Sequence, residues 1–212
     1  MKTKKVNFDH VFFDLDGVIQ NHQSKSPELV HKKIRNILKH IPSERLGVIT
    51  NNPVAWQQLK TYNLDKCVNP DLVFQSYDVA LDLAKEMMDK NDYIFLNGLD
   101  DVSKSVYSSD PCMYASIIED VVTKKPGVYM FNEAIKKINA DPEKCLIIGD
   151  SYEDIMGGSF AGWKTLYLKG LEDDHYCTVD KLGIKPDFVV DREKIGDLET
   201  ILFSPIYDKA VI

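Results

Sequence analysis

The stretch HVFFDLDGVI, residues 10–19, joins an apolar segment to two aspartates and a glycine. The apolar residues predict a buried strand over 10–15, with Asp14 and Asp16 two positions apart near its carboxyl end. Because side chains alternate along an extended strand, both carboxylates are expected on the same side. Paired carboxylates repel each other, so this strand end favours a bound divalent cation, with Mg²⁺ the oxygen-seeking candidate. A turn at Asp16-Gly17 with a solvated Asp14 is the plainer alternative for this stretch taken alone.

Similar apolar runs recur along the chain and alternate with helical patterns, as expected of a parallel sheet covered by helices on both faces. We therefore predict an α/β fold in three layers around a central parallel sheet. Further strands are expected at residues 46–50, 72–76, 144–150, 164–168 and 187–190. In an open sheet of this kind, ligands bind at the carboxyl ends of the strands.

Helical spacing of apolar residues predicts helices over residues 26–41 and 128–138. Ser26 is expected to cap the first of these helices. A third helix is expected to start at Asn52, where a proline follows a strand directly. Gly162 is expected to take the left-handed conformation that commonly ends a helix.

The segment over residues 78–123 follows this alternation less clearly. VALDLAKEMM, residues 79–88, predicts a helix, and YIFLNG, residues 93–98, predicts a strand. Residues 103–120 carry mixed signals that fit a loop, a hairpin or a short helix. We therefore expect one domain over residues 1–212, with an insertion at about 78–123.

Composition excludes several classes of protein. The 212 residues are 44% hydrophobic and 28% charged, which is typical of a soluble globular domain. The sequence shows no apolar run of the roughly 20 residues that span a bilayer and no apolar leader of signal-peptide length, so we expect no membrane partner. The four cysteines are widely separated, which favours a cytoplasmic location with reduced thiols. A net charge of −7 disfavours polymeric nucleic acid but leaves a small phosphorylated ligand open.

Other predicted strand ends place polar side chains at the same edge of the sheet. Asp150 ends one strand, and Asp154 follows four residues later, where a divalent cation or a helix start would favour it. Thr50 and Asn51 lie at another strand end near a helix start, an arrangement that can hold a phosphate. Lys125 precedes a proline, which favours an extended segment leading toward the site. Taken singly, a strand residue, a helix cap and a solvated lysine are the plainer interpretations.

Together, these pieces resemble the haloacid dehalogenase (HAD) superfamily of phosphotransferases. The resemblance rests on four motifs in one order: DLDGV at 14–18, VITNN at 48–52, KP at 125–126 and GDSYED at 149–154. It extends over residues 10–170, and PDFVVDREKIGDLETIL at 186–202 is similar to the closing strand and helix of the family. The resemblance implies a three-layer Rossmann-like fold with a small or reduced cap insertion.

The resemblance also implies catalytic roles. Asp14 would be the nucleophile that becomes an aspartyl phosphate, and Asp16 would protonate the leaving alkoxide and later activate water. Thr50 and Lys125 would orient and neutralise the phosphoryl oxygens, and Asn51 is a further candidate substrate contact. Because Asp16 serves an alkoxide leaving group, its presence disfavours the dehalogenase branch.

The implied cofactor is Mg²⁺. The resemblance assigns it to the Asp14 carboxylate, the Asp16 backbone carbonyl and the Asp150 carboxylate. Asp154 would be a further ligand or a partner of one of these groups.

Spacing between the motifs bears on the cap. Only 33 residues separate Asp16 from Thr50, which leaves little room at the first insertion point of the family, whereas 74 residues separate Thr50 from Lys125. The second gap is short for a full cap and similar either to p-nitrophenylphosphatase-like or to phosphoglycolate-phosphatase-like members. A reduced cap would leave an open entrance, suited to a larger substrate or to a homo-oligomer in which a partner protomer completes the pocket.

The function expected from this resemblance is a Mg²⁺-dependent phosphatase acting on a small phosphomonoester, such as a sugar phosphate or a nucleotide. A phosphomutase, which returns the phosphoryl group to its substrate, is the closest alternative. A non-catalytic phosphate-binding regulatory protein is the alternative from another class, because a fold alone does not determine function.

Overall fold

Six parallel strands form the central sheet in the computed structural model, which describes residues 5–20, 28–170 and 183–204. The strand order is β4-β3-β2-β5-β6-β7. Their bounds are β2 His10–Phe13, β3 Leu46–Thr50, β4 Val73–Gln75, β5 Cys145–Gly149, β6 Lys164–Lys169 and β7 Phe188–Asp191. The chain starts with β2 in the middle and builds outward to both sides, so the sheet has its topological switch point beside β2, where such folds bind ligands.

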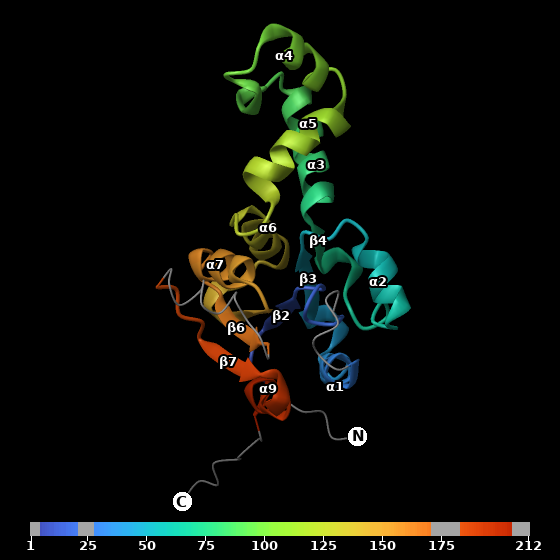
Figure 1. The fold of residues 1–212 in the computed structure, drawn as a ribbon, viewed down its shortest axis with the longest axis vertical. Coiled ribbons are helices and arrows are strands. Elements are labelled where there is room, and N and C mark those ends of the chain that lie inside the picture. Colours follow the sequence, from blue (N-terminus) through green and yellow to red (C-terminus); the bar gives the residue numbers. More distant parts are fainter. Residues whose placement is uncertain (1–4, 21–27, 171–182, 205–212) are drawn as a thin grey trace, which may run out of the picture.

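Helices cover both faces of this sheet, which gives three layers (Figure 1). Val11 and Phe13 of β2 point to the face covered by α1 (Glu28–Leu38), α2 (Ala55–Thr61) and α9 (Gly196–Leu202). Phe12 points to the opposite face, covered by α6 (Tyr129–Ile138), while Ile155 of α7 (Tyr152–Phe160) packs on Tyr167 of β6. This arrangement confirms the predicted three-layer α/β fold with a central parallel sheet.

The observed elements agree with the predicted ones to within one or two residues at most ends. β3 has the predicted bounds, and the helix predicted over 128–138 is α6. The helix predicted from Asn52 starts later, because Asn52 folds into a turn in which its Oδ1 accepts the Val54 N–H at 2.9 Å. Gly162 has a φ of +78°, as predicted. Ser26 lies outside the described residues.

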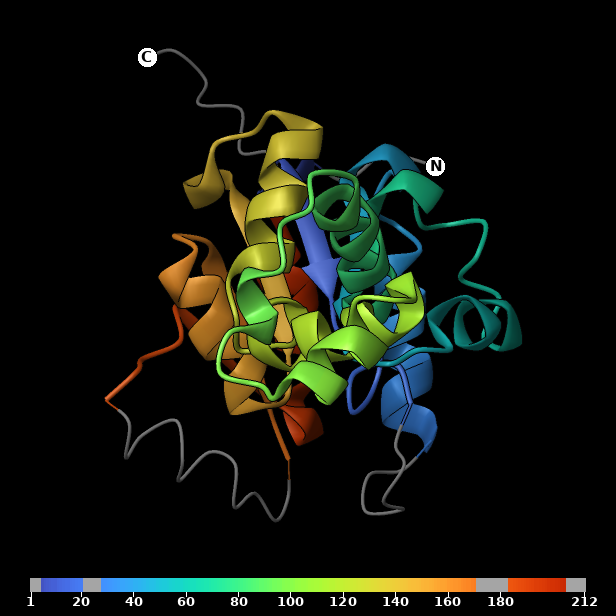
Figure 2. The same cartoon turned by 90° about the horizontal axis from the view of Figure 1, so that it is seen from above.

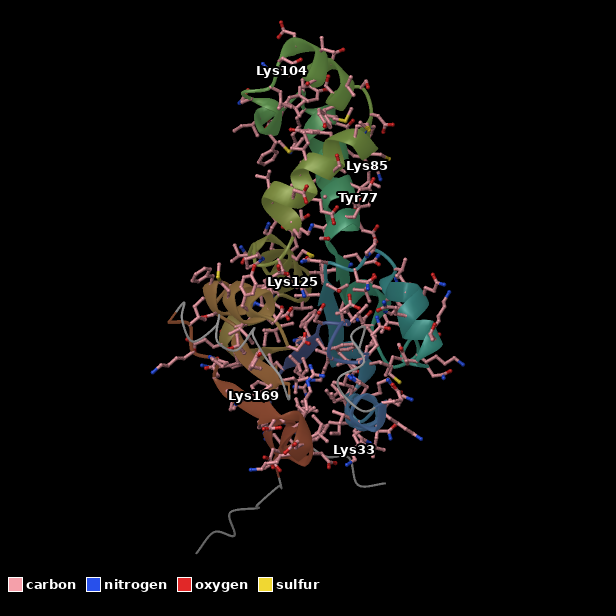
Figure 3. All side chains as sticks on the ribbon, viewed as in Figure 1. Lys33, Tyr77, Lys85, Lys104, Lys125 and Lys169 are labelled. Atoms are coloured by element: carbon pink, nitrogen blue, oxygen red, sulfur yellow. The ribbon has the colours of Figure 1, made fainter. Side chains whose placement is uncertain are left out.

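A helical insertion, residues 76–123, projects from the core along the long axis of the molecule (Figure 1). Seen from above, it lies over the core (Figure 2). Its elements are α3 (Ser76–Asp89), α4 (Asp101–Tyr107), α5 (Pro111–Ile118) and a π-helical turn (Glu119–Thr123). Figure 3 shows Lys104 at its far end and Lys125 at its base.

The helical insertion has a small core of its own. Ala80 and Ala84 of α3 pack with Tyr114 and Ala115 of α5, all of them buried. Small alanines let the two helices approach closely, so the insertion needs no strand pairing to hold together. The residues over 103–120, which carried mixed signals, form α4 and α5.

The strand predicted over YIFLNG, residues 93–98, is wrong. Ile94–Leu96 form a 3-10 turn instead, and Leu96 is buried against α3 and α5. The apolar run therefore serves the helical core, since the described residues of the insertion offer no neighbouring strand to pair with.

The two ends of the helical insertion meet where it joins the core. The buried Thr123 hydroxyl donates a hydrogen bond to the Ser76 carbonyl oxygen at 2.8 Å. The Ser76 hydroxyl in turn donates to Glu119 Oε1 at 2.5 Å. The insertion is thus closed at its base by two hydrogen bonds, two residues before Lys125.

The ends of the described chain also pair. β1 (Lys5–Val6) and β8 (Phe203–Ser204) form an antiparallel two-stranded sheet, and the Asn7 N–H donates to the Leu202 carbonyl at 2.9 Å. Within the described residues, no helix has the length and apolar character needed to cross a membrane.

Candidate active site

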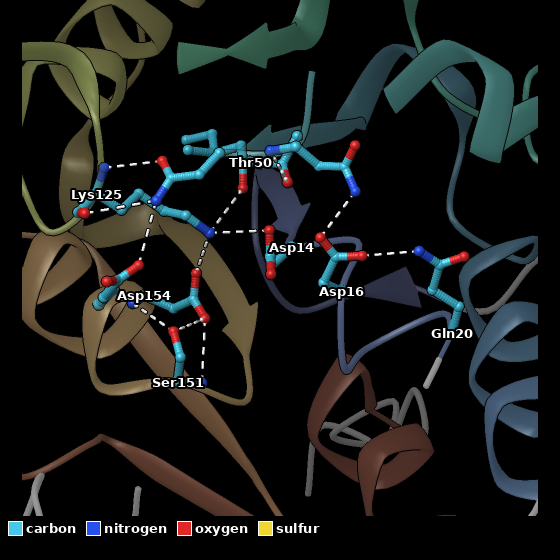
Figure 4. Close-up of polar contacts among 11 residues, drawn as sticks. Asp14, Asp16, Gln20, Thr50, Lys125, Ser151 and Asp154 are labelled. Carbon is cyan, nitrogen blue, oxygen red and sulfur yellow. Dashed lines mark hydrogen bonds and ion pairs between the residues drawn. The ribbon is translucent and has the colours of Figure 1, made fainter. Parts of the chain in front are cut away.

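Asp14 lies directly after β2 at the carboxyl edge of the sheet (Figure 4). Its N–H donates to the Ile148 carbonyl at 2.9 Å, which prolongs the pairing of β2 with β5 and fixes the backbone of the aspartate. The side chain is buried. The nucleophile proposed from the sequence therefore stands on a rigid strand end, held from both sides by neighbouring strands.

Three carboxylates meet at this edge. Asp14, Asp150 and Asp154 each offer one oxygen, and these three oxygens lie within 4.8 Å of one another. Burial raises the pKa of Asp14 to about 6, against the lowering effect of the Lys125 charge. Burial and the charge of Asp154 raise the pKa of Asp150 to about 7. The positive groups of the protein therefore do not fully compensate the negative charge of the three carboxylates. A bound cation would supply the missing positive charge.

The donor set fits Mg²⁺. Mg²⁺ prefers carboxylate oxygens at 2.0–2.1 Å, so two of its ligands lie at most about 4.2 Å apart. The three oxygens lie within 4.8 Å of one another, which is close to that limit. Asp14 Oδ1 is buried and lies 2.8 Å from the Lys125 Nζ in an ion pair. Asp14 therefore offers a buried carboxylate to the cluster, with one oxygen already beside a positive charge.

Lys125 lies buried between two of the carboxylates. Its Nζ is 2.8 Å from Asp14 Oδ1, 2.5 Å from Asp154 Oδ1 and 3.3 Å from the Ile49 carbonyl. Burial lowers the pKa of Lys125, but the two carboxylates outweigh burial and leave the pKa raised, so the ammonium stays charged. The plainer interpretation from sequence, a solvated lysine, is therefore wrong.

Asp154 connects this lysine to the start of α7. Its Oδ2 accepts hydrogen bonds from the Ser151 hydroxyl at 2.7 Å and from the Ser151 N–H at 3.2 Å, which completes a capping box with the Ser151 side chain. Its other oxygen contacts Lys125. Because both oxygens already have partners within the protein, the geometry favours Asp154 as the residue that orients Lys125 over a direct metal ligand.

Thr50 is the last residue of β3, and Asn51 comes directly after it. The Thr50 side chain is buried, and its hydrogen bond to Asp14 lowers the pKa of that carboxyl. Asn51 Oδ1 accepts the Lys125 N–H at 2.9 Å, and its Nδ2 donates to Glu153 at 3.2 Å. The Asn51 side chain therefore fastens the Lys125 segment to β3 and α7, an arrangement that the sequence did not predict.

Asp16 lies apart from the three clustered carboxylates. Its Oδ2 accepts a hydrogen bond from Asn52 Nδ2 at 2.8 Å, and its Oδ1 accepts one from Gln20 Nε2 at 2.7 Å (Figure 4). Two amide side chains therefore hold this carboxylate in place. The two aspartates of the opening stretch stand in different surroundings, one facing the buried lysine and the other facing neutral amides.

The turn after Asp16 depends on a glycine. Gly17 has a φ of +75°, and an added Cβ would lie 1.7 Å from Asp150 Oδ2. Only glycine combines this backbone conformation with so close an approach. The DxDG pattern therefore brings the loop after β2 onto the carboxylate that follows β5.

Sequence reasoning missed three members of the site: Gln20, Asn52 as a partner of Asp16, and Arg192. Arg192 Nη2 lies 3.0 Å from Asp150 Oδ2, and Arg192 directly follows β7. Asp150 was identified because it directly follows a predicted strand. Arg192 also directly follows a strand, so the same signal could have identified it. Asn52 carried no comparable signal, because asparagine is common in turns, and Gln20 does not stand at a predicted strand end.

Comparison with known proteins agrees with this fold and these motifs. A family model described as HAD-hyrolase-like matches residues 122–194. The pyrophosphatase PpaX of Anoxybacillus flavithermus is 25% identical over 232 residues, which cover 93% of this chain and 98% of the relative. The pyrophosphatase PpaX of Bacillus cereus is 37% identical over 86 residues, 40% of this chain and 37% of the relative.

Among solved structures, the p-nitrophenyl phosphatase from Archaeoglobus fulgidus matches with a TM-score of 0.61 and 16% identity. The match covers 92% of this chain and all of that one, at 100%. Such a likeness to a solved structure supports the fold alone. The predicted resemblance to the HAD superfamily is confirmed by the family model over residues 122–194 and by the relatives, so the chain is similar to HAD-like hydrolases.

Proposed function

We propose that this chain is a Mg²⁺-dependent phosphatase that hydrolyses a small phosphomonoester through an aspartyl phosphate on Asp14. The observation that carries the proposal is the buried Lys125, whose Nζ contacts Asp14 at 2.8 Å within a group of three carboxylates. A cation beside a carboxylate nucleophile neutralises the approach of a phosphate dianion, which is the main electrostatic barrier to this chemistry.

The proposed reaction proceeds in two transfers. An oxygen of Asp14 forms a bond to phosphorus while the bond to the leaving-group oxygen breaks, and Asp16 gives that oxygen a proton. Water then attacks the aspartyl phosphate, Asp16 takes the proton of the water, and Asp14 is released as a carboxylate together with inorganic phosphate. Lys125 and Thr50 hold the phosphoryl oxygens throughout.

Mg²⁺ would be held by Asp14 and Asp150, with the Asp16 carbonyl as a third protein ligand and Asp154 beside them. When bound, the ion supplies positive charge to the phosphoryl oxygens. Asn51 keeps the Lys125 segment in register with β3 through the N–H of Lys125.

Substrate choice is proposed to lie with the helical insertion, which acts as a reduced cap on a single domain. Sugar phosphates and nucleotides are the proposed substrates. Inorganic pyrophosphate is a second candidate, supported by the names of the relatives that match the chain over most or part of its length. A homo-oligomer would let a partner protomer complete the entrance, and the three described cysteines, all free, support a reducing cytoplasmic location.

The test is phosphate release from p-nitrophenyl phosphate, inorganic pyrophosphate, sugar phosphates and nucleotides, with Mg²⁺ and with a chelator. Asp14→Asn should lower the rate by at least about a thousandfold, because it removes the nucleophile. Asp9→Asn, at the other end of β2, is the matched control and should keep the wild-type rate. Acid-quenched wild-type protein should carry a phosphoryl group that mass spectrometry finds on Asp14.

The alternatives give different results. A phosphomutase would return a rearranged phosphomonoester in place of free phosphate. A regulatory protein would bind phosphorylated ligands without turnover across the whole panel. Full activity of Asp14→Asn would overturn the aspartyl-phosphate route.

A further inference from the structure

Arg192 stands at the carboxyl end of the last strand of the sheet. It begins the 3-10 turn Arg192–Lys194 immediately after β7, and the Asp191 side chain caps that turn by accepting the Glu193 N–H at 2.9 Å. β7 is paired in parallel with β6, which is paired in parallel with β5. Arg192 therefore emerges at the same edge as Asp150, two strand positions or about 10 Å along the sheet.

The arginine reaches back across this edge to Asp150. Arg192 Nη2 lies 3.0 Å from Asp150 Oδ2, and the arginine side chain is only 6% exposed. The Asp150 side chain is 27% exposed, so the carboxylate is open on one side and held on the other. A buried guanidinium is costly unless it is paired, which indicates that the packing around β7 enforces this contact.

The three clustered carboxylates contact different positively charged side chains. Lys125 contacts Asp14 and Asp154 directly, whereas among the residues that the structure describes it is Arg192 that forms an ion pair with Asp150. Without that contact, Asp150 would face only the carboxylates of Asp14 and Asp154 within the cluster, where the three oxygens lie within 4.8 Å of one another. Like charges would then turn this carboxylate away from the other two.

We propose that Arg192 is the positioning residue for metal binding, holding one oxygen of Asp150 so that the carboxylate stays directed at Asp14 and the divalent cation. This inference rests on the proposed function, since it concerns the metal that the phosphatase would use. Residues that hold metal ligands in place in this way commonly contribute 10–100-fold to metal affinity.

Removal of the arginine has two opposing effects on a metal ion. Loss of the contact frees Asp150 and weakens binding, whereas loss of a nearby positive charge removes repulsion and strengthens it. We expect the first effect to be the larger one, because Arg192 neutralises a carboxylate that otherwise repels its neighbours.

The experiment measures binding of Mn²⁺ alone, followed by the electron paramagnetic resonance signal of the free ion, with Mg²⁺ as competitor. Arg192→Met should weaken Mn²⁺ binding by about 10- to 100-fold. Arg192→Lys, which keeps the charge on a shorter side chain, should restore part of the affinity. Arg45→Met is the matched control: Arg45 pairs with Asp9 at the opposite edge of the sheet, so its loss should leave Mn²⁺ affinity unchanged.

Unchanged or tighter Mn²⁺ binding by Arg192→Met would overturn the proposal, and so would an Arg192→Lys variant that binds as weakly as Arg192→Met. Circular dichroism melts without metal identify unfolded protein, and if Arg192→Met does not fold, Arg192→Lys carries the comparison with wild type. Asp150→Asn separates a failure of the proposed metal site from a failure of the role proposed for Arg192. If Asp150→Asn binds Mn²⁺ as tightly as wild type, the proposed metal site itself is wrong, whatever Arg192 does.

Discussion

Because Gly17 has no side chain, the loop after β2 can approach Asp150 at the carboxyl edge of the sheet. The residue has a φ of +75°, and a Cβ there would meet Asp150 Oδ2 at 1.7 Å. The same Asp150 oxygen lies 3.0 Å from Arg192 Nη2. A carboxylate displaced by an added Cβ would therefore have to change its contact with the arginine.

We expect Gly17→Ala to displace Asp150 and to lower the Mg²⁺-dependent rate by about a hundredfold, the upper part of the range for loss of metal-ligand positioning. Gly98→Ala is the matched control, because Gly98 also has a positive φ, +92°, but an added Cβ there meets no atom within 4 Å. Both variants should lose roughly 1 kcal/mol of folding free energy from backbone strain. Equal rates for the two variants in the phosphate-release assay would contradict this account.

At the scale of elements, the base of the helical insertion depends on one buried hydroxyl. Thr123 donates to the Ser76 carbonyl at 2.8 Å, and both residues are at most 1% exposed. That bond ties the end of the π-helical turn to the first residue of α3. It therefore sets where the chain leaves the insertion, two residues before Lys125.

Thr123→Val keeps the shape of the side chain but leaves the Ser76 carbonyl buried without this donor. We expect a loss of about 1–3 kcal/mol of folding free energy. For a chain of this length, a loss of 2 kcal/mol lowers the melting temperature by roughly 4–8 °C. Thr61→Val is the control: its hydroxyl makes a bond of the same kind, to the Gln57 carbonyl at 2.8 Å, on an exposed stretch of α2. Identical melting temperatures for the two variants in calorimetry would refute the prediction.

At the scale of the whole molecule, the sheet gathers functional side chains that are far apart in sequence. Asp14, Thr50, Asp150 and Arg192 all stand at carboxyl ends of parallel strands, and burial of Asp14 and Arg192 strengthens the interactions of their charges with neighbouring groups. Stability of the whole fold therefore depends on which buried groups are charged. His31 of α1 is the clearest neutral case, because its Nδ1–H donates to the Val18 carbonyl at 3.0 Å and the ring is 1% exposed.

Burial lowers the pKa of His31 from 6.5, and the charges of Arg192 and Arg35 lower it further, against raising effects of the Val18 hydrogen bond and Glu28. A histidine whose pKa is lower in the folded state binds more protons when unfolded. Its contribution to stability is therefore present above about pH 6.5 and is lost as the pH falls toward the folded pKa.

We accordingly expect the wild type to lose stability relative to His31→Gln as the pH falls from about 7 to 5, with a slope of at most about 1.4 kcal/mol per pH unit. Chemical denaturation at a series of pH values measures this difference. His40→Gln, at an exposed position on the same side of the core, should follow the wild-type profile. A constant difference between wild type and His31→Gln would count against a buried neutral ring.

The sheet and much of its edge were predictable, because apolar strand runs and the residues that end them are local signals. Asp14, Thr50 and Asp150 each follow directly from such a run, and the order of the strands brings them together. The burial of Lys125 was not predictable from its own segment. It depends on Asp14 and Asp154, which lie 111 and 29 residues away in the sequence.

The helical insertion was the least predictable part. Residues 93–98 have the composition of a strand, but the described insertion offers them only helices to pack on, so tertiary contacts override local preference. Arg192 and Gln20 were missed for a different reason. Their partners, Asp150 and Asp16, were predicted members of the site, but a sequence does not show which distant side chain will contact them.

The helical insertion begins at Ser76 and ends at Thr123, and one hydrogen bond joins these two residues. The insertion is therefore closed at its base and does not take part in the sheet of the core. A shorter or longer insertion that begins at Ser76 and ends at Thr123 would leave the strands and Lys125 where they are. Under the proposed function, evolution could therefore alter the segment above the acidic edge, and with it the choice of substrate, without moving the carboxylates and the lysine below.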